Sequence, residues 1–190
     1  VIEMPAIRTE SISPNPALRD ALWRFSDREG EKWLVFTSPI GVSVFFEQLV
    51  EMKMDLRALF CIAGTAKVAA IGSSTAKALS QHGVFPDLVP AVYSAEELGR
   101  ALAEKAEEGS HVLIARAEKG SEDLIPPLHD AGISTEDIPL YRTVYEVEPM
   151  LKDRIREMLE NGEIDAVTFT SGSTVRGFTK ALGQMDFTVV

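Results

Sequence analysis

Segments typical of strands alternate with segments typical of helices along most of this sequence, and that order limits the folds open to the chain. The run "KWLVFT" is apolar and suited to a buried strand, and "GVSVFFEQLVEM" follows it with apolar residues at helical spacing. In the same way "KVAAIG" precedes "SSTAKALSQHG", and "HVLIAR" precedes "SEDLIPPLHDAG". This order predicts a parallel sheet that is covered by helices on both faces.

Capping residues and prolines mark several predicted element ends. Ser94 stands before "AEELGRALAEK" as an N-cap, and Gly109 follows that segment as a stop. Pro126 and Pro127 predict an irregular or kinked helix after "HVLIAR". The segment "DLVPAV" is predicted to be short and extended.

We expect an α/β fold with two flavodoxin-like or Rossmann-like lobes, each built on a parallel sheet. Residues 13–137 contain enough units for a complete lobe, and residues 148–190 supply part of a second one. Residues 1–12 and 138–147 contain extended stretches that are predicted to pair as a two-stranded connection. In the second lobe a helix, "MLKDRIREMLENG", precedes the predicted strands "DAVTFT" and "DFTVV". One strand-helix-strand piece cannot bury both faces of a sheet, so we expect this lobe to be incomplete in this chain.

Charge and cysteine content disfavour several functions. A net charge of −10 argues against nucleic acid as the main partner, because binding to phosphates needs clustered Lys and Arg. Cys61 is the only cysteine, which excludes an internal disulfide, and the histidines lack a metal-binding spacing. No apolar run approaches the roughly 20 residues that span a bilayer, and no secretory signal is evident. We expect a cytoplasmic monomer without a bound metal or a membrane contact.

Two distant segments, "FTSPIGVSVFFEQL" and "FTSGSTVRGFTKAL", repeat a strand, a Thr-Ser turn and an amphipathic helix. Such turns place hydroxyls and free backbone N–H groups at the carboxyl edge of a parallel sheet, where ligands bind in open α/β folds. Helix N-termini at that edge attract anions without any lysine. The candidate binding residues in these turns are Thr37, Ser38, Gly72, Ser73, Ser74, Thr75, Thr170, Ser171 and Ser173. The alternative for each Ser or Thr is an ordinary helix cap, which is worth about 1 kcal/mol.

The turn in "IGSSTAKAL" also bears on nucleotide binding. It lacks the G-x-G-x-x-G spacing of a dinucleotide fingerprint and the G-x-x-x-x-G-K-[ST] spacing of a P-loop. A flavodoxin-like nucleotide or phosphate binder is therefore the weakest of the functional interpretations.

Six segments, taken in order, resemble the uroporphyrinogen-III synthase family. They are "WLVFTSPIGVSVFFEQL", "KVAAIGSSTAKALSQHGVFPDLVP", "YSAEELGRALAE", "VLIARAEKGSEDLIPPLHDAGI", "IPLYRTVYE" and "DAVTFTSGSTVRGFTKAL". The resemblance implies two α/β lobes joined by a two-stranded ladder, with the chain passing from one lobe to the other and back. It also implies a lyase of tetrapyrrole and heme biosynthesis that uses no cofactor. Such an enzyme closes hydroxymethylbilane to uroporphyrinogen III, inverting the last pyrrole ring and releasing water.

The resemblance suggests roles for individual residues. Tyr141 in "LYRT" is the candidate proton donor for the leaving hydroxyl, and the alternative is an aromatic that packs at the interlobe hinge. Thr75 matches the family's hydroxyl at its turn and is the second catalytic candidate. The serines of the turns are expected to bind the carboxylates of the substrate. Arg116 is expected to pair with one of those carboxylates, or else with Glu118 or Glu122 at the surface.

Three positions depart from the pattern of the family. Ile40, Ala117 and Ser121 stand where polar, basic or glycine residues are common in its members. Fewer cations would then face an acidic ligand. The departures leave open an alternative function, a tetrapyrrole- or anion-binding regulatory module of the same fold without catalytic activity.

Overall fold

A computed structural model describes residues 1–61, 65–169 and 171–183. The first elements are β1 (Arg8–Ser11), α1 (Pro16–Asp27), β2 (Glu31–Phe36), α2 (Pro39–Glu51), α3 (Leu56–Cys61), β3 (Thr65–Ala70) and α4 (Ser73–Ser80). They are followed by α5 (Ala95–Lys105), β4 (His111–Ala117), the short 3-10 helix η1 (Glu122–Leu124), α6 (Ile125–Asp130), β5 (Ser134–Val144), α7 (Pro149–Glu160) and α8 (Gly172–Leu182).

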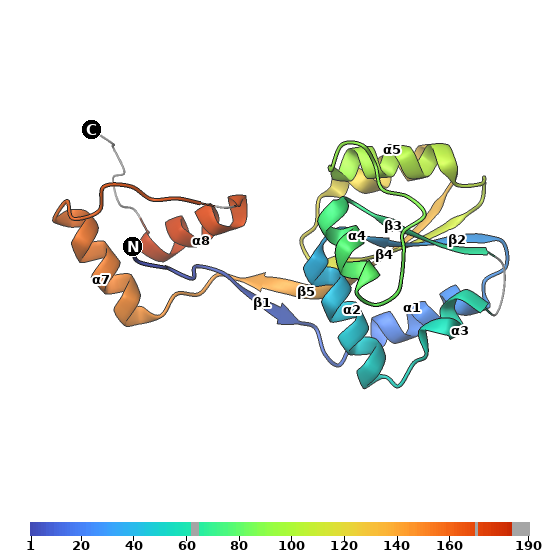
Figure 1. Cartoon of the computed structure of the whole chain (residues 1–190), viewed down its shortest axis with the longest axis horizontal. Coiled ribbons are helices and arrows are strands. Elements are labelled where there is room, and N and C mark those ends of the chain that lie inside the picture. The colour runs from blue at the N-terminus through green and yellow to red at the C-terminus, as the bar shows by residue number, and fades with distance from the viewer. Residues whose placement is uncertain (62–64, 170, 184–190) are drawn as a thin grey trace. The chain divides into compact units, whose positions relative to one another are not determined.

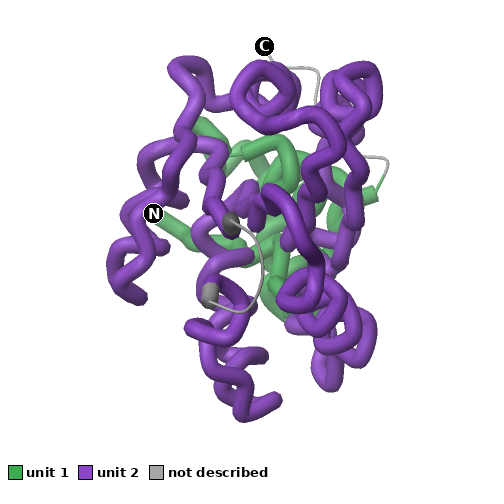
Figure 2. Tube along the Cα trace, turned by 90° about the vertical axis from the view of Figure 1, so that its right-hand side faces the viewer, with its two compact units in different colours: residues 1–10, 143–190 green, residues 11–142 purple. Residues whose placement is uncertain are grey.

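The chain divides into two compact units, which Figure 2 shows in different colours. One unit is Ser11–Arg142, and the other combines Val1–Glu10 with Thr143–Val190. The two are described separately below as the large unit and the small unit. The lobe boundaries expected from the sequence remain a prediction.

A five-stranded sheet with the order β1-β5-β4-β2-β3 organises the fold. β2 pairs in parallel with both β3 and β4, and β4 pairs in parallel with β5. This confirms the predicted α/β fold with a mostly parallel sheet. The expected pairing of the two extended stretches is also confirmed, because β1 and β5 are neighbours in the sheet.

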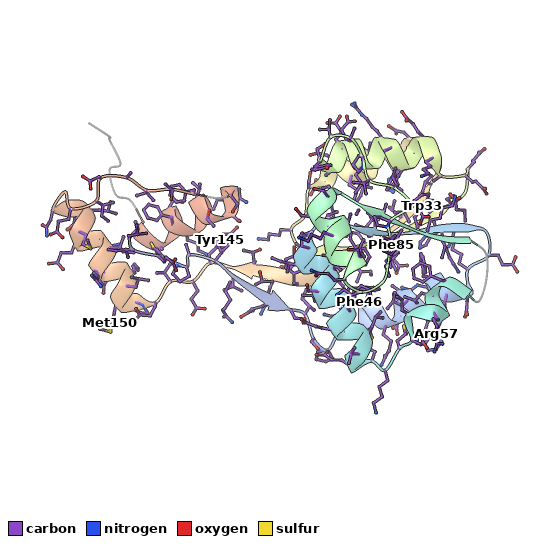
Figure 3. All side chains as sticks on the ribbon, viewed as in Figure 1. Trp33, Phe46, Arg57, Phe85, Tyr145 and Met150 are labelled. Atoms are coloured by element: carbon purple, nitrogen blue, oxygen red, sulfur yellow. The ribbon has the colours of Figure 1, made fainter. Side chains whose placement is uncertain are left out.

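Helices cover both faces of the sheet in the large unit, as Figure 1 shows. Successive side chains of β2 point to opposite faces, so that Leu34 and Phe36 join one apolar cluster while Trp33 and Val35 join the other. The first cluster takes its helical residues from α1 to α4, and the second takes them from α5, η1 and α6. Phe46 of α2, labelled in Figure 3, stacks on His82 at a ring-centroid distance of 3.8 Å, which ties α2 to the turn after α4.

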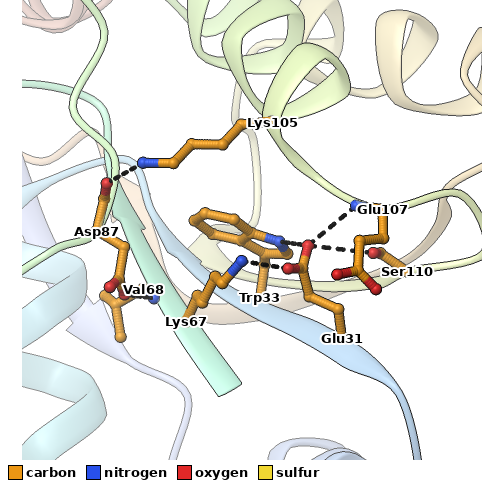
Figure 4. A network of polar contacts seen from close by, with 8 residues as sticks. All are labelled: Glu31, Trp33, Lys67, Val68, Asp87, Lys105, Glu107 and Ser110. Atoms are coloured by element: carbon orange, nitrogen blue, oxygen red, sulfur yellow. Dashed lines mark hydrogen bonds and ion pairs between the residues drawn. The ribbon is translucent and has the colours of Figure 1, made fainter. Parts of the chain in front are cut away.

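Glu31 and its partners fix the amino end of this sheet (Figure 4). The Glu31 carboxylate pairs with Lys67 and accepts hydrogen bonds from Trp33 Nε1 at 2.7 Å and from the Glu107 backbone N–H at 3.1 Å. Burial opposes ionisation of Glu31, but these hydrogen bonds prevail and lower its pKa. The carboxylate therefore joins β2, β3 and the segment before β4 at the amino end of the sheet.

Several local predictions need correction. No helix was predicted over Pro16–Asp27 or Leu56–Cys61, where α1 and α3 lie. "DLVPAV", predicted to be short and extended, lies in a loop that makes a single bridge from Leu88 to Ala69. By contrast, the irregular helix predicted around Pro126 is confirmed, because this segment is divided into η1 and α6.

The small unit packs α7 against α8 around Ile155, Phe178 and Leu182. The backbone of α8 approaches the N-terminal segment so closely that a Cβ on Gly177 would lie 2.4 Å from the Ala6 carbonyl oxygen. The predicted strand "DAVTFT" is wrong for its described residues 165–169, which form no strand. A strand is held by ladder hydrogen bonds to a neighbour, and no described segment pairs with these residues. The predicted strand "DFTVV" lies outside the described residues.

Among the described residues, no helix is both long and apolar enough to cross a bilayer. The same part of the chain holds no group of three or more His, Cys, Asp or Glu side chains placed to bind a metal ion.

Candidate functional site

The parallel strands of the large unit bring two of the predicted turns to one edge of the sheet. β2 ends at Phe36 and β3 ends at Ala70, and the two strands run side by side in register. The Ile71 backbone N–H donates to the Phe36 carbonyl at 3.0 Å, which extends the pairing beyond the strand ends. The turns at Thr37-Ser38 and at Gly72–Thr75 are therefore neighbours at the carboxyl edge.

Ser38 and Tyr141 form the most specific contact at this edge. Their hydroxyl oxygens lie 2.8 Å apart, and either group can be the donor. Ser38 is also the N-cap of α2, because its Oγ accepts the Gly41 backbone N–H at 2.9 Å. The Tyr141 side chain is 7% exposed and belongs to the apolar cluster under α2, whereas Ser38 is only half-buried. Two residues 103 positions apart are thus joined in one hydroxyl pair whose outer member is Ser38.

Gly41 contributes to this pair although the sequence analysis did not single it out. A Cβ at this position would lie 3.1 Å from Ser38 Oγ and 3.8 Å from Tyr141 Cε1. A larger residue would crowd the hydroxyl pair. The sequence did contain a signal for this role. Gly41 stands three positions after the cap residue Ser38, where the side chain of an N-cap contacts the helix backbone.

The turn before α4 presents its residues unevenly. Ser73 and Ser74 are exposed, while Thr75 is 2% exposed. The hydroxyls of the two serines are accessible to a ligand. Contact between Thr75 and a substrate would require the surrounding side chains to move, so its predicted role stays a prediction that this geometry does not favour.

Arg116 is engaged by the protein itself. Its guanidinium binds the Asp137 carboxylate through Nε at 3.0 Å and Nη2 at 2.6 Å, and Nη1 donates to the Ser121 carbonyl. The side chain of Arg116 is 5% exposed. The predicted alternative of an ion pair with Glu118 or Glu122 is therefore wrong, because the partner is Asp137 on the neighbouring strand. The predicted contact with a substrate carboxylate would have to compete with this bidentate pair.

A hollow of about 740 Å³ lies beside Arg116, on the α6 side of the sheet. Its charged lining residues are Arg116, Lys119, Glu118, Glu122, Asp130 and Asp137. Four carboxylates face two cations, so the surplus charge is negative. This hollow does not suit a ligand that carries several carboxylates.

Ser171 and Ser173 belong to the small unit. Ser171 caps α8 in a capping box with Thr174, and the hydroxyls of Ser171 and Ser173 lie 2.9 Å apart. Ser171 therefore acts as a helix cap, and its predicted role in ligand binding stays a prediction. Thr170 lies outside the described residues.

The sequence as a whole is similar to proteins of tetrapyrrole biosynthesis. A family model described as "Uroporphyrinogen-III synthase HemD" matches residues 1–190. The "Porphyrin biosynthesis protein HemD" of Ruminiclostridium josui is 32% identical over 181 residues, covering 95% of this chain and 34% of that protein. The "Uroporphyrinogen-III synthase" of Chlorobaculum parvum is 30% identical over 169 residues, covering 86% of this chain and 65% of that protein. This chain spans only part of the length of both relatives.

Solved structures share the fold at low sequence identity. A mutant uroporphyrinogen III synthase from the extremely thermophilic bacterium Thermus thermophilus superposes with a TM-score of 0.64 at 23% identity, covering 93% of this chain and 66% of that one. Uroporphyrinogen-III synthetase from Helicobacter pylori gives a TM-score of 0.55 at 18% identity, covering 95% and 72%.

Proposed function

The chain belongs to the uroporphyrinogen-III synthase family, and from this premise we propose that it closes hydroxymethylbilane to uroporphyrinogen III. The reaction inverts the last pyrrole ring and releases water. The enzyme would be a hydro-lyase acting on a small-molecule substrate, as a cytoplasmic monomer and without a cofactor. The net charge of −10 disfavours a nucleic-acid partner.

The chemical demand is mainly one of orientation. Loss of the hydroxyl gives an electrophilic azafulvene, and an unguided chain closes at the nearer position to give the uninverted isomer. A site that holds the chain bent, so that the substituted carbon attacks, can supply several kcal/mol through alignment alone. The carboxyl edge of the large unit offers fixed donors for this task, because the turns at Ser38 and Ser73 expose hydroxyls beside helix N-termini.

The hydrogen bond between Ser38 and Tyr141 is the single observation that carries the chemical proposal. Tyr141 is buried and Ser38 is half-buried, so we propose that a proton reaches the substrate through Ser38. Tyr141 donates to Ser38 Oγ while Ser38 donates its own proton to the leaving hydroxyl, which departs as water. The Gly41 N–H that already binds Ser38 Oγ polarises the serine for this role. After closure a ring carbon loses a proton, and this proton returns through Ser38 to the Tyr141 phenolate, so that the net product beside the ring is one water.

The carboxylates of the substrate would bind to hydroxyls and backbone N–H groups at the carboxyl edge of the sheet, and not to the buried Arg116. Ser73 and Ser74 are exposed at the start of α4, and the first turn of a helix carries N–H groups without intrahelical partners. We propose these donors, together with Thr37, as the carboxylate contacts of the large unit, while Ser38 contacts the leaving hydroxyl. Ser171 and Ser173 are proposed to serve the same purpose in the small unit.

The test is a product assay with the full-length protein. Hydroxymethylbilane is supplied, and the porphyrin isomers are separated by chromatography after oxidation. We expect uroporphyrinogen III at a rate well above spontaneous closure. Formation of only the uninverted isomer at the spontaneous rate would contradict the proposed function.

A further inference from the structure

An aromatic side chain lies directly against the turn before α4. A Cβ on Gly72 would lie 2.8 Å from Cγ and 2.9 Å from Cδ2 of Tyr93. Real Cβ atoms do not approach other atoms so closely, so the ring occupies the space that any other residue at position 72 would need. Gly72 is buried, and Tyr93 supplies part of its cover.

The conformation of Gly72 does not explain why glycine stands there. Its φ of −173° and ψ of 179° are extended angles that any residue adopts. The reason is therefore space rather than backbone freedom. Gly72 lets the Tyr93 ring lie against the backbone at the point where α4 begins.

The loop between α4 and α5 holds Tyr93 in place from both sides. Upstream, Leu88 bridges Ala69, and the Ala70 N–H donates to the Leu88 carbonyl at 3.0 Å. Downstream, the Ser94 N–H donates to the Val92 carbonyl at 2.9 Å, and the Ser94 hydroxyl caps α5. Tyr93 stands next to this cap, so its position is set by the sheet edge and by α5 together.

Despite this support, most of the Tyr93 side chain is uncovered. It is 60% exposed, and its neighbour Val92 is also 60% exposed. Ile40, at the start of α2 on the adjacent turn, is 47% exposed. Apolar surface thus lies beside the exposed hydroxyls of Ser73 and Ser74 at one edge of the sheet. A ligand with flat apolar rings and peripheral carboxylates matches this combination of groups.

We propose that Tyr93 is a substrate-contacting residue, whose ring stacks on a pyrrole ring and so selects the bent form of the chain. This inference rests on the proposed function and names one surface of the same site. Gly72 acts indirectly, by leaving room for the ring. Stacked aromatic rings attract one another beyond the area that they bury, which suits recognition of a flexible chain of pyrroles.

Steady-state kinetics of the full-length protein with hydroxymethylbilane, together with the isomer ratio of the product, test the proposal. Tyr93→Ala is expected to raise KM about fivefold to tenfold with a smaller change in kcat, and to raise the share of the uninverted isomer. Tyr93→Phe keeps the ring and is expected to restore both values. Gly72→Ala is expected to reproduce the effect of Tyr93→Ala by displacing the ring, and the double variant should be no worse than either single variant.

Phe85→Ala is the matched control, because Phe85 is 76% exposed and lies on the same loop (Figure 3). It should leave KM and the isomer ratio within about twofold of the wild type. If the wild type is active and Tyr93→Ala leaves KM and the isomer ratio unchanged, this inference is overturned and the proposed function still stands. Failure of the wild type to form uroporphyrinogen III would overturn both. A thermal melt of each variant separates loss of folding from loss of substrate contact.

Discussion

The two ends of the sheet in the large unit are built from different chemistry. At the amino end, the Glu31 carboxylate meets Lys67, Trp33, Ser110 and the Glu107 N–H, and its side chain is 3% exposed (Figure 4). At the carboxyl end, the turns carry hydroxyls, glycines and an exposed aromatic ring, with Ser38 bound to Tyr141. The amino end of β2 and β3 has its charges paired within the protein, and the carboxyl end of the same two strands keeps donors accessible.

This difference separates the residues that hold the fold from those that serve a ligand. A buried charge is tolerated only when its own chain pairs it, so the amino end has little capacity left for a ligand. Hydroxyls and helix N–H groups are neutral and can stay partly exposed without such a penalty. A variant at the amino end should therefore change stability and leave activity intact, and a variant at the carboxyl end should change activity more than stability.

The largest expected effect is on stability at the amino end. Glu31→Gln removes the charge that pairs with Lys67 and weakens the hydrogen bonds from Trp33 and Glu107, so we expect a loss of about 3 kcal/mol in the free energy of unfolding. Chemical denaturation measures this loss. The kcat of the folded protein should not change.

Glu29→Gln is the control for this variant, because Glu29 carries the same charge two positions away and is exposed. It should shift the free energy of unfolding by less than about 0.5 kcal/mol. Equal effects of the two variants, or loss of kcat in folded Glu31→Gln, would break the distinction between the two ends.

At the carboxyl end, Tyr141→Phe removes the hydroxyl that binds Ser38 and keeps the ring in its apolar cluster. We expect kcat to fall about 10²-fold, because a positioned proton donor contributes at least that much, with a change in stability of about 1 kcal/mol. Steady-state rates with hydroxymethylbilane and a denaturation curve measure the two quantities. An unchanged kcat would reject the proton-donor role of Tyr141, and Tyr145→Phe, a tyrosine of the small unit, serves as the control.

The sequence predicted the carboxyl edge of the sheet because each of its turns follows from a pattern within one strand-helix unit. Apolar strands that precede capped helices place the turns at Ser38 and Gly72 on the same side of a parallel sheet, and the structure brings them together. The helix over Pro16–Asp27 escaped notice although Leu18, Leu22 and Phe25 follow helical spacing, because nearby prolines favoured an extended interpretation. In that case the signal was present in the sequence.

Contacts that depend on strand register were not accessible in the same way. Arg116 has Glu118 and Glu122 close by in sequence, but β4 and β5 pair in a register that brings Asp137 beside it. The contact between Tyr93 and Gly72 was not predicted either, because it depends on the path of the loop between α4 and α5. Residues 165–169 were predicted to form a strand from their apolar pattern alone, but such a run becomes a strand only beside a partner strand.

A smaller effect is expected from Ser38→Ala. This variant removes both the cap of α2 and the outer member of the hydroxyl pair, so we expect a loss of about 1 kcal/mol in stability. The loss in kcat should be only about tenfold, because a water molecule in place of the serine hydroxyl can still relay the proton of Tyr141. In the Tyr141→Phe background the loss in kcat should shrink, because the two hydroxyls act in one path. Ser43→Ala, an exposed serine on the same helix, is the matched control. Full additivity of the Ser38 and Tyr141 effects would contradict a shared path for the proton.

The smallest effect concerns pH and again separates the two ends. Burial, aided by the positive charge of Arg28, lowers the pKa of His111, which binds Ser134 at the amino end of the sheet. Below the ordinary histidine pKa of about 6.5, the unfolded chain takes up a proton that the folded chain still excludes, so stability falls as the pH drops through that value. Glu31 adds to this loss only at lower pH, since its lowered pKa stabilises the fold above the ordinary value of 4.5, and that contribution disappears as the pH falls through the folded pKa. The measurement is the free energy of unfolding of the wild type and of His111→Asn between about pH 8 and pH 5. It should fall more steeply with decreasing pH in the wild type, and an equal slope in both proteins would show that His111 does not cause the decline.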